Sequence, residues 1–113
     1  MHELALSQSI VDLVLERAAA ERLRTVTRVV VEVGVAAGVD PEALRFCFDA
    51  VAEATAARGA ELVIIGVSLR TRCRTCSHEF EPAGRLAACP TCGGPRADLL
   101  RGRELRVTSF DAE

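Results

Sequence analysis

Two pairs of closely spaced cysteines constrain this chain more than any other feature of its sequence. Cys73 and Cys76 form one Cys-x-x-Cys pair, Cys89 and Cys92 form a second, and twelve residues separate the two. Each pair favours a tight turn whose backbone N–H groups point at the sulfur atoms, and two facing turns supply four thiolates to one tetrahedral site. Zn²⁺ suits such a site because it accepts soft sulfur ligands and imposes no geometry of its own. The spacing therefore predicts a four-cysteine zinc site.

Three other interpretations of these cysteines stay open from spacing alone. Disulfides are disfavoured if the chain is cytosolic, where thiols stay reduced. A redox Cys-x-x-Cys pair is disfavoured because two pairs at this distance are not the thioredoxin arrangement, and iron in a rubredoxin-like site is compatible with the spacing. We favour a structural metal, since so small a segment cannot bury enough surface to fold without one.

Two further residues, Cys47 and His78, have side chains of types that can bind a metal ion. Cys47 is expected to be a small buried hydrophobe on the apolar face of a helix. His78 follows the first cysteine pair by two residues and is expected to be a solvated loop histidine. The alternative for His78 is a pH-sensitive neighbour of the metal site.

Length and composition exclude several classes of protein. The chain has 113 residues and weighs 12.1 kDa, which bounds it at one modest domain, or one domain carrying a small module. A net charge of -2 and a pI near 5.7 give no overall attraction to nucleic acid or anionic lipid. No apolar run reaches the ~18 residues that a membrane helix needs. The start at Met1-His2-Glu3 lacks a secretion signal, so we expect a cytoplasmic protein without membrane contact.

Charge is distributed unevenly along the chain. Residues 1–69 carry six arginines against ten acidic residues, whereas residues 70–106 carry eight arginines against four acidic residues. Four of the five cysteines lie in the second part. We therefore predict one domain formed by residues 1–69 together with residues 98–113, interrupted by a metal-binding module at residues 70–97.

Hydrophobic periodicity predicts the elements around this module. Apolar residues at helical spacing predict a helix over 4–22 and a second from the cap Asp40-Pro41 to Gly59. β-Branched runs predict strands at 25–35 and 61–69, and alternation predicts a third strand at 104–110. The predicted fold is α+β: a small mixed three-stranded sheet with two helices, plus an inserted rubredoxin-like zinc-ribbon module. The side chains expected to face the core are Leu6, Ile10, Leu13, Val14, Ala18, Val29, Val31, Val33, Leu44, Cys47, Phe48, Val51 and Ala54.

The first three residues offer a second set of metal ligands. An initiator Met before a bulky His is normally retained, so the free amine is expected on Met1. That amine, the deprotonated amide nitrogen of His2 and the His2 imidazole fit three corners of a square plane around Ni²⁺ or Cu²⁺. The amide or carboxylate of Glu3, or a ligand from a partner, would complete the plane. The alternative is a polar histidine before a helix, with Glu3 complementing the positive helix end.

In order and spacing, the motifs together resemble the HypA/HybF family of nickel metallochaperones for [NiFe]-hydrogenase maturation. The resemblance covers essentially the whole chain. Its motifs are Met1-His2-Glu3, Glu32-Val33-Gly34, Leu44-Arg45-Phe46, Gly59-Ala60-Glu61-Leu62, the two cysteine pairs, and Gly102-Arg103-Glu104-Leu105.

The resemblance implies a non-enzymatic nickel carrier with His2 as the essential nickel ligand and Glu3 assisting. It implies structural zinc on the four cysteines. It also implies two partners: a nickel-handling maturation GTPase of the HypB type, and the large-subunit precursor of a [NiFe]-hydrogenase. Some members carry a histidine beside both cysteine pairs, whereas here Gly93 follows the second pair. The chain is expected to be a monomer or a homodimer.

Two other functions compete with the carrier. A zinc-ribbon module that binds nucleic acid or acts as an adaptor is favoured by the basic residues around the cysteines, Arg70, Arg72, Arg74 and Arg85. It is disfavoured because Phe80 is the only aromatic ring available there for base stacking. An enzyme is disfavoured because the sequence has no phosphate-binding glycine loop and no nucleophile beside an evident base.

Overall fold

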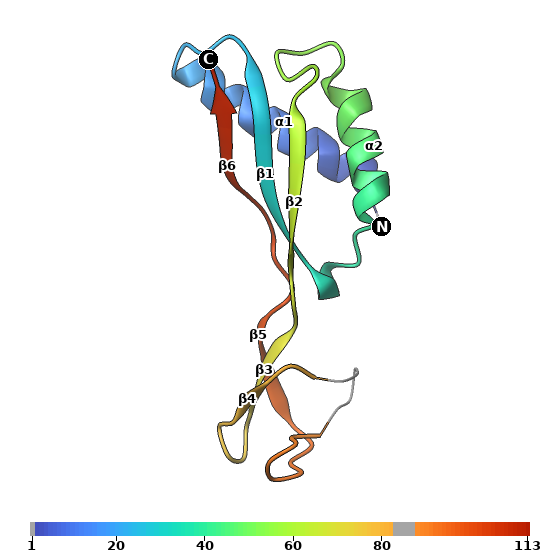
Figure 1. Ribbon diagram of the computed structural model, residues 1–113, viewed down its shortest axis with the longest axis vertical. Helices are drawn as coiled ribbons and strands as arrows, with labels where there is room; N and C mark the ends of the chain where they lie inside the picture. The colour runs from blue at the N-terminus through green and yellow to red at the C-terminus, as the bar shows by residue number, and fades with distance from the viewer. Residues whose placement is uncertain (1, 83–87) are drawn as a thin grey trace.

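The computed structural model describes residues 2–82 and 88–113 and is elongated, with extents of 55 × 26 × 16 Å (Figure 1). Both helices belong to the upper part in this view, and the cysteine pairs belong to the lower part. The elements in chain order are α1 (Glu3–Ala20), β1 (Val26–Gly34), the short 3-10 helix η1 (Val35–Ala37), α2 (Pro41–Ala52), β2 (Glu61–Val67), β3 (Arg70–Cys73), β4 (Glu79–Phe80), β5 (Ala97–Arg101) and β6 (Leu105–Ala112).

The upper sheet has the strand order β2-β1-β6. β1 and β2 run parallel, with Val29 opposite Leu62, because α2 carries the chain back between them. β6 returns from the lower part and pairs antiparallel with β1, with Phe110 opposite Val29. The predicted α+β fold with a mixed three-stranded sheet and two helices is therefore confirmed.

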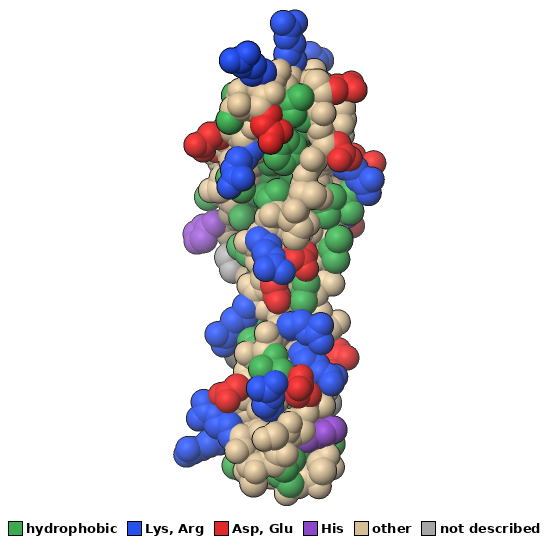
Figure 2. Space-filling model, turned by 90° about the vertical axis from the view of Figure 1, so that its left-hand side faces the viewer, with side chains coloured by type: hydrophobic (Ala, Val, Ile, Leu, Met, Phe, Trp, Pro, Cys, Tyr) green, Lys and Arg blue, Asp and Glu red, His purple; other side chains and the backbone are tan. Residues whose placement is uncertain are grey.

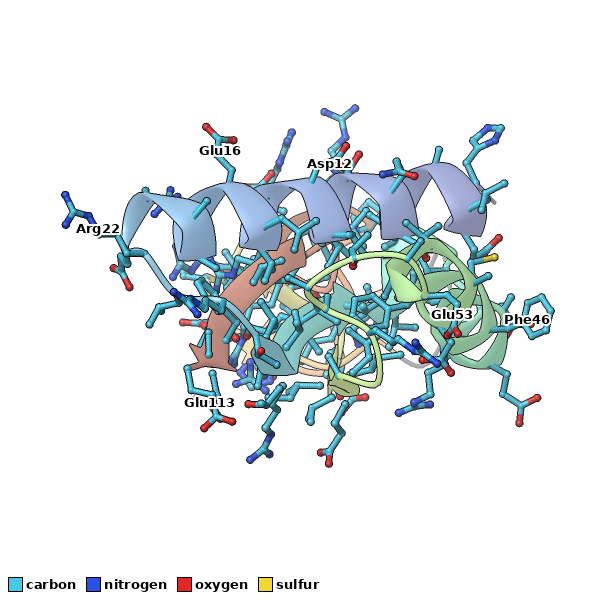
Figure 3. All side chains as sticks on the ribbon, turned by 90° about the horizontal axis from the view of Figure 1, so that it is seen from above. Asp12, Glu16, Arg22, Phe46, Glu53 and Glu113 are labelled. Atoms are coloured by element: carbon cyan, nitrogen blue, oxygen red, sulfur yellow. The ribbon has the colours of Figure 1, made fainter. Side chains whose placement is uncertain are left out.

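One core joins the two helices to the inner face of this sheet. Val29, Leu44 and Phe48 are fully buried, and Val31 and Val33 lie on the same face of β1 as predicted. Asp12 and Glu16 lie on the outer side of α1, away from the sheet (Figure 3). Leu13 departs from the expectation, because it is 40% exposed where α1 diverges from β6.

α2 begins as the sequence predicts and ends earlier. The Asp40 carboxylate accepts the backbone N–H of Glu42 at 2.9 Å and that of Ala43 at 3.3 Å, which caps the helix. The helix ends at Ala52 rather than near Gly59, because the Thr55 hydroxyl donates to the Ala52 carbonyl and accepts the N–H of Ala57, closing a turn. Ala54 was therefore placed wrongly in the core and is exposed.

The lower sheet is small and holds the first cysteine pair at its end. Its order is β4-β3-β5, with both neighbours antiparallel to β3. β3 ends at Cys73, which lies opposite Ala97 of β5. Across residues 2–82 and 88–113, no helix has the length and hydropathy that crossing a bilayer requires.

Two glycines make the connection between the sheets possible. The N–H of Gly34 donates to the Glu104 carbonyl at 2.7 Å, and the N–H of Ala36 donates to the Gly102 carbonyl at 2.7 Å. A Cβ on Gly34 would lie 2.6 Å from the backbone nitrogen of Arg103 and closer still to the Gly102 carbonyl. Gly102 has a φ of 119°, which favours glycine. We call this crossing of β1 and the β5–β6 connection the neck.

Gly34→Ala is expected to destabilise the protein by about 2 kcal/mol or more, because the new Cβ collides with rigid backbone at the neck. The measurement is chemical denaturation of the metal-loaded protein. Gly66→Ala in β2 is the matched control, since its Cβ would meet nothing within 4 Å. Its free energy of unfolding should change by less than about 1 kcal/mol. Equal stability of the two variants would contradict the role assigned to the neck.

Candidate metal centres

The four cysteines of the two pairs converge on one point. Cys73 Sγ lies 3.6 Å from Cys92 Sγ, and Cys76 Sγ lies 3.6 Å from Cys89 Sγ. All four sulfur atoms lie within 4.8 Å of one another. Sulfurs at about 2.3 Å from a tetrahedral Zn²⁺ are about 3.8 Å apart, so the cluster matches that ion in donor type, number and spacing.

The two cysteine pairs form matching turns. In the first turn the N–H of Thr75 donates to Cys73 Sγ at 3.3 Å, and in the second the N–H of Thr91 donates to Cys89 Sγ at 3.4 Å. A further N–H, from Gly94, donates to Cys92 Sγ at 3.4 Å. Gly93 has a φ of 75°, which lets the second turn close. These bonds favour the thiolate form that binds a metal.

The thiol pKa values are driven apart by these surroundings. The backbone N–H groups of Cys76 and Thr75 lower the pKa of Cys73 to about 6. The N–H of His78 acts to lower the pKa of Cys76, but burial and the other thiols outweigh it and raise that pKa to about 12. Close thiols resist joint ionisation unless a cation neutralises them. The cluster is therefore chemically suited to a divalent cation.

His78 and the basic residues of the lower part do not extend the cluster. His78 is exposed and stacks on Phe80, with ring centroids 6.0 Å apart and planes 8° from parallel. Phe80 itself is buried, which removes the ring that base stacking would need. Arg72 pairs with Glu79 at 3.3 Å and Arg74 with Asp98 at 2.7 Å, so part of the basic charge is neutralised. Arg85 lies outside the described residues.

The N-terminal segment lies where the two helices begin. His2 is exposed and precedes α1, and its carbonyl accepts the N–H of Leu6 at 2.9 Å. Met1, the third residue predicted for this site, lies outside the described residues. One helical turn later, the Ser7 hydroxyl donates to the Leu44 carbonyl at 3.3 Å and fixes α1 against α2. Both helices therefore point their N-termini at the same corner of the molecule.

Glu3 connects this segment to the loop before α2. Its Oε2 accepts the backbone N–H of Asp40 at 3.0 Å. That bond and the N–H of Glu3 itself lower the pKa of the Glu3 carboxyl, so it is ionised at neutral pH. Two helix N-termini contribute about +0.5 charge each, while Glu3 and Asp40 contribute two negative charges. The two carboxylates therefore offset the positive helix ends at this corner.

Asp40 contacts the N-terminal segment, which the sequence did not predict. The sequence marks Asp40 as a helix cap, and the structure confirms that role. Its second contact joins residues 37 apart in the chain, and no local pattern signals it. Cys47 lies half-buried on α2 and does not belong to the four-cysteine cluster.

Comparison with known proteins identifies the family. The chain matches, over residues 1–112, the family model described as "Hydrogenase/urease nickel incorporation, metallochaperone, hypA". The hydrogenase maturation factor HypA of Chlorobium phaeobacteroides is 42% identical to this chain over 113 residues. The alignment covers 100% of both proteins. The same factor of Geotalea daltonii is 43% identical over 107 residues, covering 95% of this chain and 94% of the relative.

Solved structures show the same relationship. The solution structure of the Ni metallochaperone HypA from Helicobacter pylori superposes with a TM-score of 0.70 at 26% identity, covering 99% of this chain and 97% of that one. A second solution structure of a HypA protein superposes with a TM-score of 0.77 at 26% identity. The match covers 100% of this chain and 97% of that one. The chain therefore belongs to the HypA family of nickel metallochaperones, which are maturation factors and not enzymes.

Cys92→Ser is expected to weaken Zn²⁺ binding by about 100-fold or more, because it removes one of four converging donors. Competition with a coloured chelator at neutral pH measures this. Cys47→Ser removes a thiol outside the cluster and should leave Zn²⁺ affinity unchanged. If both variants bind Zn²⁺ like the native chain, or both lose it, the four-cysteine assignment is wrong.

Proposed function

We propose that this chain takes up Ni²⁺ at its N-terminal segment and delivers it for assembly of the active site of a [NiFe]-hydrogenase. The observation that carries the proposal is the family match over residues 1–112, together with an exposed His2 at the start of α1. In this proposal nickel is cargo, and the four cysteines hold a separate structural Zn²⁺.

The nickel ligands proposed are nitrogen atoms of the first residues. The Met1 amine, the His2 amide nitrogen and the His2 imidazole take three corners of a square plane. The first N–H groups of an α-helix have no acceptor within it, so the amide of His2 is not required by the helical ladder of α1. Glu3 supplies its amide or carboxylate, or a partner's ligand takes that position. An ion whose coordination sphere is not filled by this chain can be transferred to a partner's ligands.

Glu3 is proposed to hold this segment in place as well. Its bond to the Asp40 N–H fixes the first turn of α1 against the loop before α2. Less chain entropy is then lost when the terminal residues bind an ion. Once the Met1 amine has lost its proton to coordinate, the carboxylates of Glu3 and Asp40 outweigh the two helix ends and add electrostatic attraction for Ni²⁺.

Zn²⁺ on Cys73, Cys76, Cys89 and Cys92 is proposed to stabilise the inserted module. The buried part of this module is small, comprising Cys73, Phe80 and Cys89 among the described residues. A metal with four thiolate bonds supplies the folding energy that such a core lacks. We propose that residues 70–97 form the main part of this metal-dependent module, which the rest of β5 extends to Arg101. We propose that residues 1–69 and the returning strand β6 form the nickel-binding domain.

The partners proposed are those of a cytoplasmic maturation pathway. A maturation GTPase of the HypB type would exchange nickel with the chain, and the large-subunit precursor of a [NiFe]-hydrogenase would receive it. The relatives are named hydrogenase maturation factors, which supports this assignment. The lower part carries the neutralised arginine pairs described above, and this favours a protein partner over nucleic acid.

His2→Ala is expected to reduce nickel binding from about one ion per chain to an undetectable level, since the imidazole and its chelate ring are lost. Calorimetry and the nickel absorption band, followed together on zinc-loaded protein, measure the stoichiometry. His78→Ala is the matched control, because it removes the other histidine of the chain. Nickel retained by His2→Ala, or lost by His78→Ala, would contradict the site.

Acetylation of the Met1 amine should weaken nickel binding by about tenfold or more, because it converts a coordinating amine into an amide. For the native start, Ni²⁺ must displace any proton held by the amine or the imidazole, so affinity should fall as pH drops. The acetylated chain should show a shallower pH dependence, because it has no terminal amine to deprotonate. Identical affinity and pH slope in both proteins would exclude the amine as a ligand.

A further inference from the structure

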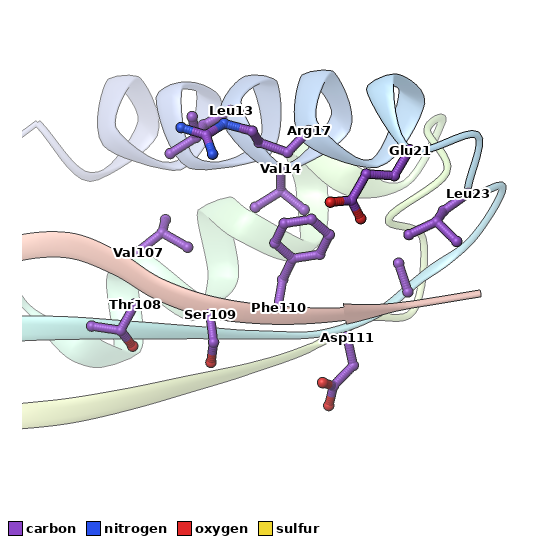
Figure 4. A pocket seen from close by; sticks show the side chains of 11 residues that line it. Leu13, Val14, Arg17, Glu21, Leu23, Val107, Thr108, Ser109, Phe110 and Asp111 are labelled. Atoms are coloured by element: carbon purple, nitrogen blue, oxygen red, sulfur yellow. The ribbon is translucent and has the colours of Figure 1, made fainter.

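A cavity at the neck differs in its lining from the groove between α1 and β6. The groove has a volume of about 540 Å³, and Figure 4 shows Val107 and Phe110 pointing into it from the strand toward the helix. The cavity at the neck has a volume of about 570 Å³ and is lined by charged side chains of both signs. Across the described residues, the one buried side-chain nitrogen or oxygen without a hydrogen-bond partner is the Nε of Arg70, which lines this neck cavity.

Arg70 and Arg101 are neighbours in the neck cavity, and we call them the arginine pair. Arg70 begins β3 and lies opposite Arg101 of β5. Directly opposite residues on antiparallel strands present their side chains to the same face of a sheet, and like charges there repel each other. The Nε–H of Arg70 has also lost contact with solvent without gaining an acceptor, which is unfavourable for a buried donor. A negatively charged acceptor between the two side chains would relieve both costs.

The carboxylates that line the neck cavity do not neutralise the arginine pair. Glu32 pairs with the third arginine of the lining, Arg106, at 2.7 Å. Glu104 Oε1 accepts the backbone N–H of Gly102 at 2.7 Å. Glu81 is exposed, and no ion pair among the described residues includes it or either member of the arginine pair. Two adjacent guanidinium groups are therefore available to an anion from outside the chain.

The charge around the neck cavity favours an anion with a single negative charge. Residues 70–106 carry eight arginines against four acidic residues, and Figure 2 shows arginine side chains gathered around and below the neck. This surplus attracts anions to the region. The cavity lining itself holds three arginines and three glutamates, so a dianion such as phosphate would be repelled by Glu81 and Glu104. A carboxylate adds one charge, and its two oxygens match the planar N–H fork of arginine.

Apolar side chains supply another part of the lining. Ile65 is 46% exposed, and Val67 and Leu69 are half-buried at the end of β2 and just beyond it. Leu69 is held at the neck, because a Cβ on Gly102 would lie only 2.6 Å from its Cδ2. The apolar residues follow the upper sheet and the arginine pair belongs to the lower one, so an occupant would contact both sheets. The cavity volume is in the range of small-molecule sites, which leaves room for a hydrocarbon group beside a carboxylate.

From these contacts we infer that the neck cavity binds a carboxylate carried on an apolar group. The arginine pair binds the carboxylate, with the Nε–H of Arg70 as one donor, and Ile65, Val67 and Leu69 contact the apolar group. Two sources share this chemistry: a free organic acid, and the C-terminus of a polypeptide whose last residue is apolar. The cavity lining contains none of the proposed nickel or zinc ligands, so this site is independent of the proposed nickel function.

Titration of N-acetyl-leucine into the full-length, zinc-loaded chain tests this inference. This probe has a carboxylate beside an apolar side chain, and N-acetyl-leucinamide is its neutral counterpart. Proton–nitrogen NMR observes the Nε–H groups of arginine directly, and the signal of Arg70 is the one that Arg70→Lys removes. That signal should shift to saturation with N-acetyl-leucine and should not move with the neutral amide, because only the carboxylate accepts the charge-assisted bond.

Three variants, followed by their backbone amide signals, locate the site. Arg70→Lys keeps the charge but loses the planar fork, and Arg101→Gln removes the exposed member of the arginine pair. Each should weaken the binding of N-acetyl-leucine by about tenfold or more. Arg24→Gln is the matched control, since Arg24 is exposed outside the cavity lining, and it should bind like the native chain. Circular dichroism and zinc content should show that every variant folds.

Isocaproate separates the two sources, because it has the carboxylate and the branched hydrocarbon chain without the amide group of a polypeptide. Both sources fit the inference: tighter binding of N-acetyl-leucine identifies the end of a polypeptide, and equal or tighter binding of isocaproate identifies a free acid. The inference is overturned if neither carboxylate gives a saturable shift, or if the neutral amide or inorganic phosphate binds as well as they do. Native affinity in both Arg70→Lys and Arg101→Gln would also overturn it.

Discussion

The close backbone crossing at the neck is the constraint on which the rest of this structure depends. Gly34 at the end of β1 touches Gly102 on the way from β5 to β6, and neither position has room for a side chain. The crossing lets the chain leave the upper sheet after β2, build the cysteine turns, and return as β6 beside β1. The crossing explains why the motif Glu32-Val33-Gly34 ends in a glycine and why the motif Gly102-Arg103-Glu104-Leu105 begins with one. The crossing thus joins the two small sheets.

The two candidate metal centres differ in their donor atoms and in their exposure. The cysteine cluster has four soft donors held by backbone N–H groups, which suits an ion that stays. The N-terminal corner has an exposed His2 beside the ionised Glu3, whose bond to Asp40 fixes the segment. Nitrogen and oxygen donors at an exposed terminus suit an ion that is to be transferred to another protein. In the function proposed above, this difference in donor type and exposure separates the resident metal from the cargo.

Local chemistry made much of this fold predictable, and long-range geometry made the rest unpredictable. The cap at Asp40, the buried alternation of Val29 and Val31, and the pairing of the cysteine turns each depend on residues close in sequence. The bond between Glu3 and Asp40 and the exposure of Leu13 depend on how α1 lies against distant elements. Periodicity reports which face of a helix is apolar, but not whether a neighbouring strand covers all of it.

The central proposal for this protein is that nickel and zinc occupy different sites with different donor atoms. X-ray absorption at the nickel and zinc edges of one doubly loaded sample tests it most directly. We expect nitrogen and oxygen neighbours around nickel with no sulfur, and four sulfur neighbours at about 2.3 Å around zinc. Sulfur in the nickel shell, or fewer than four sulfurs around zinc, would contradict the account.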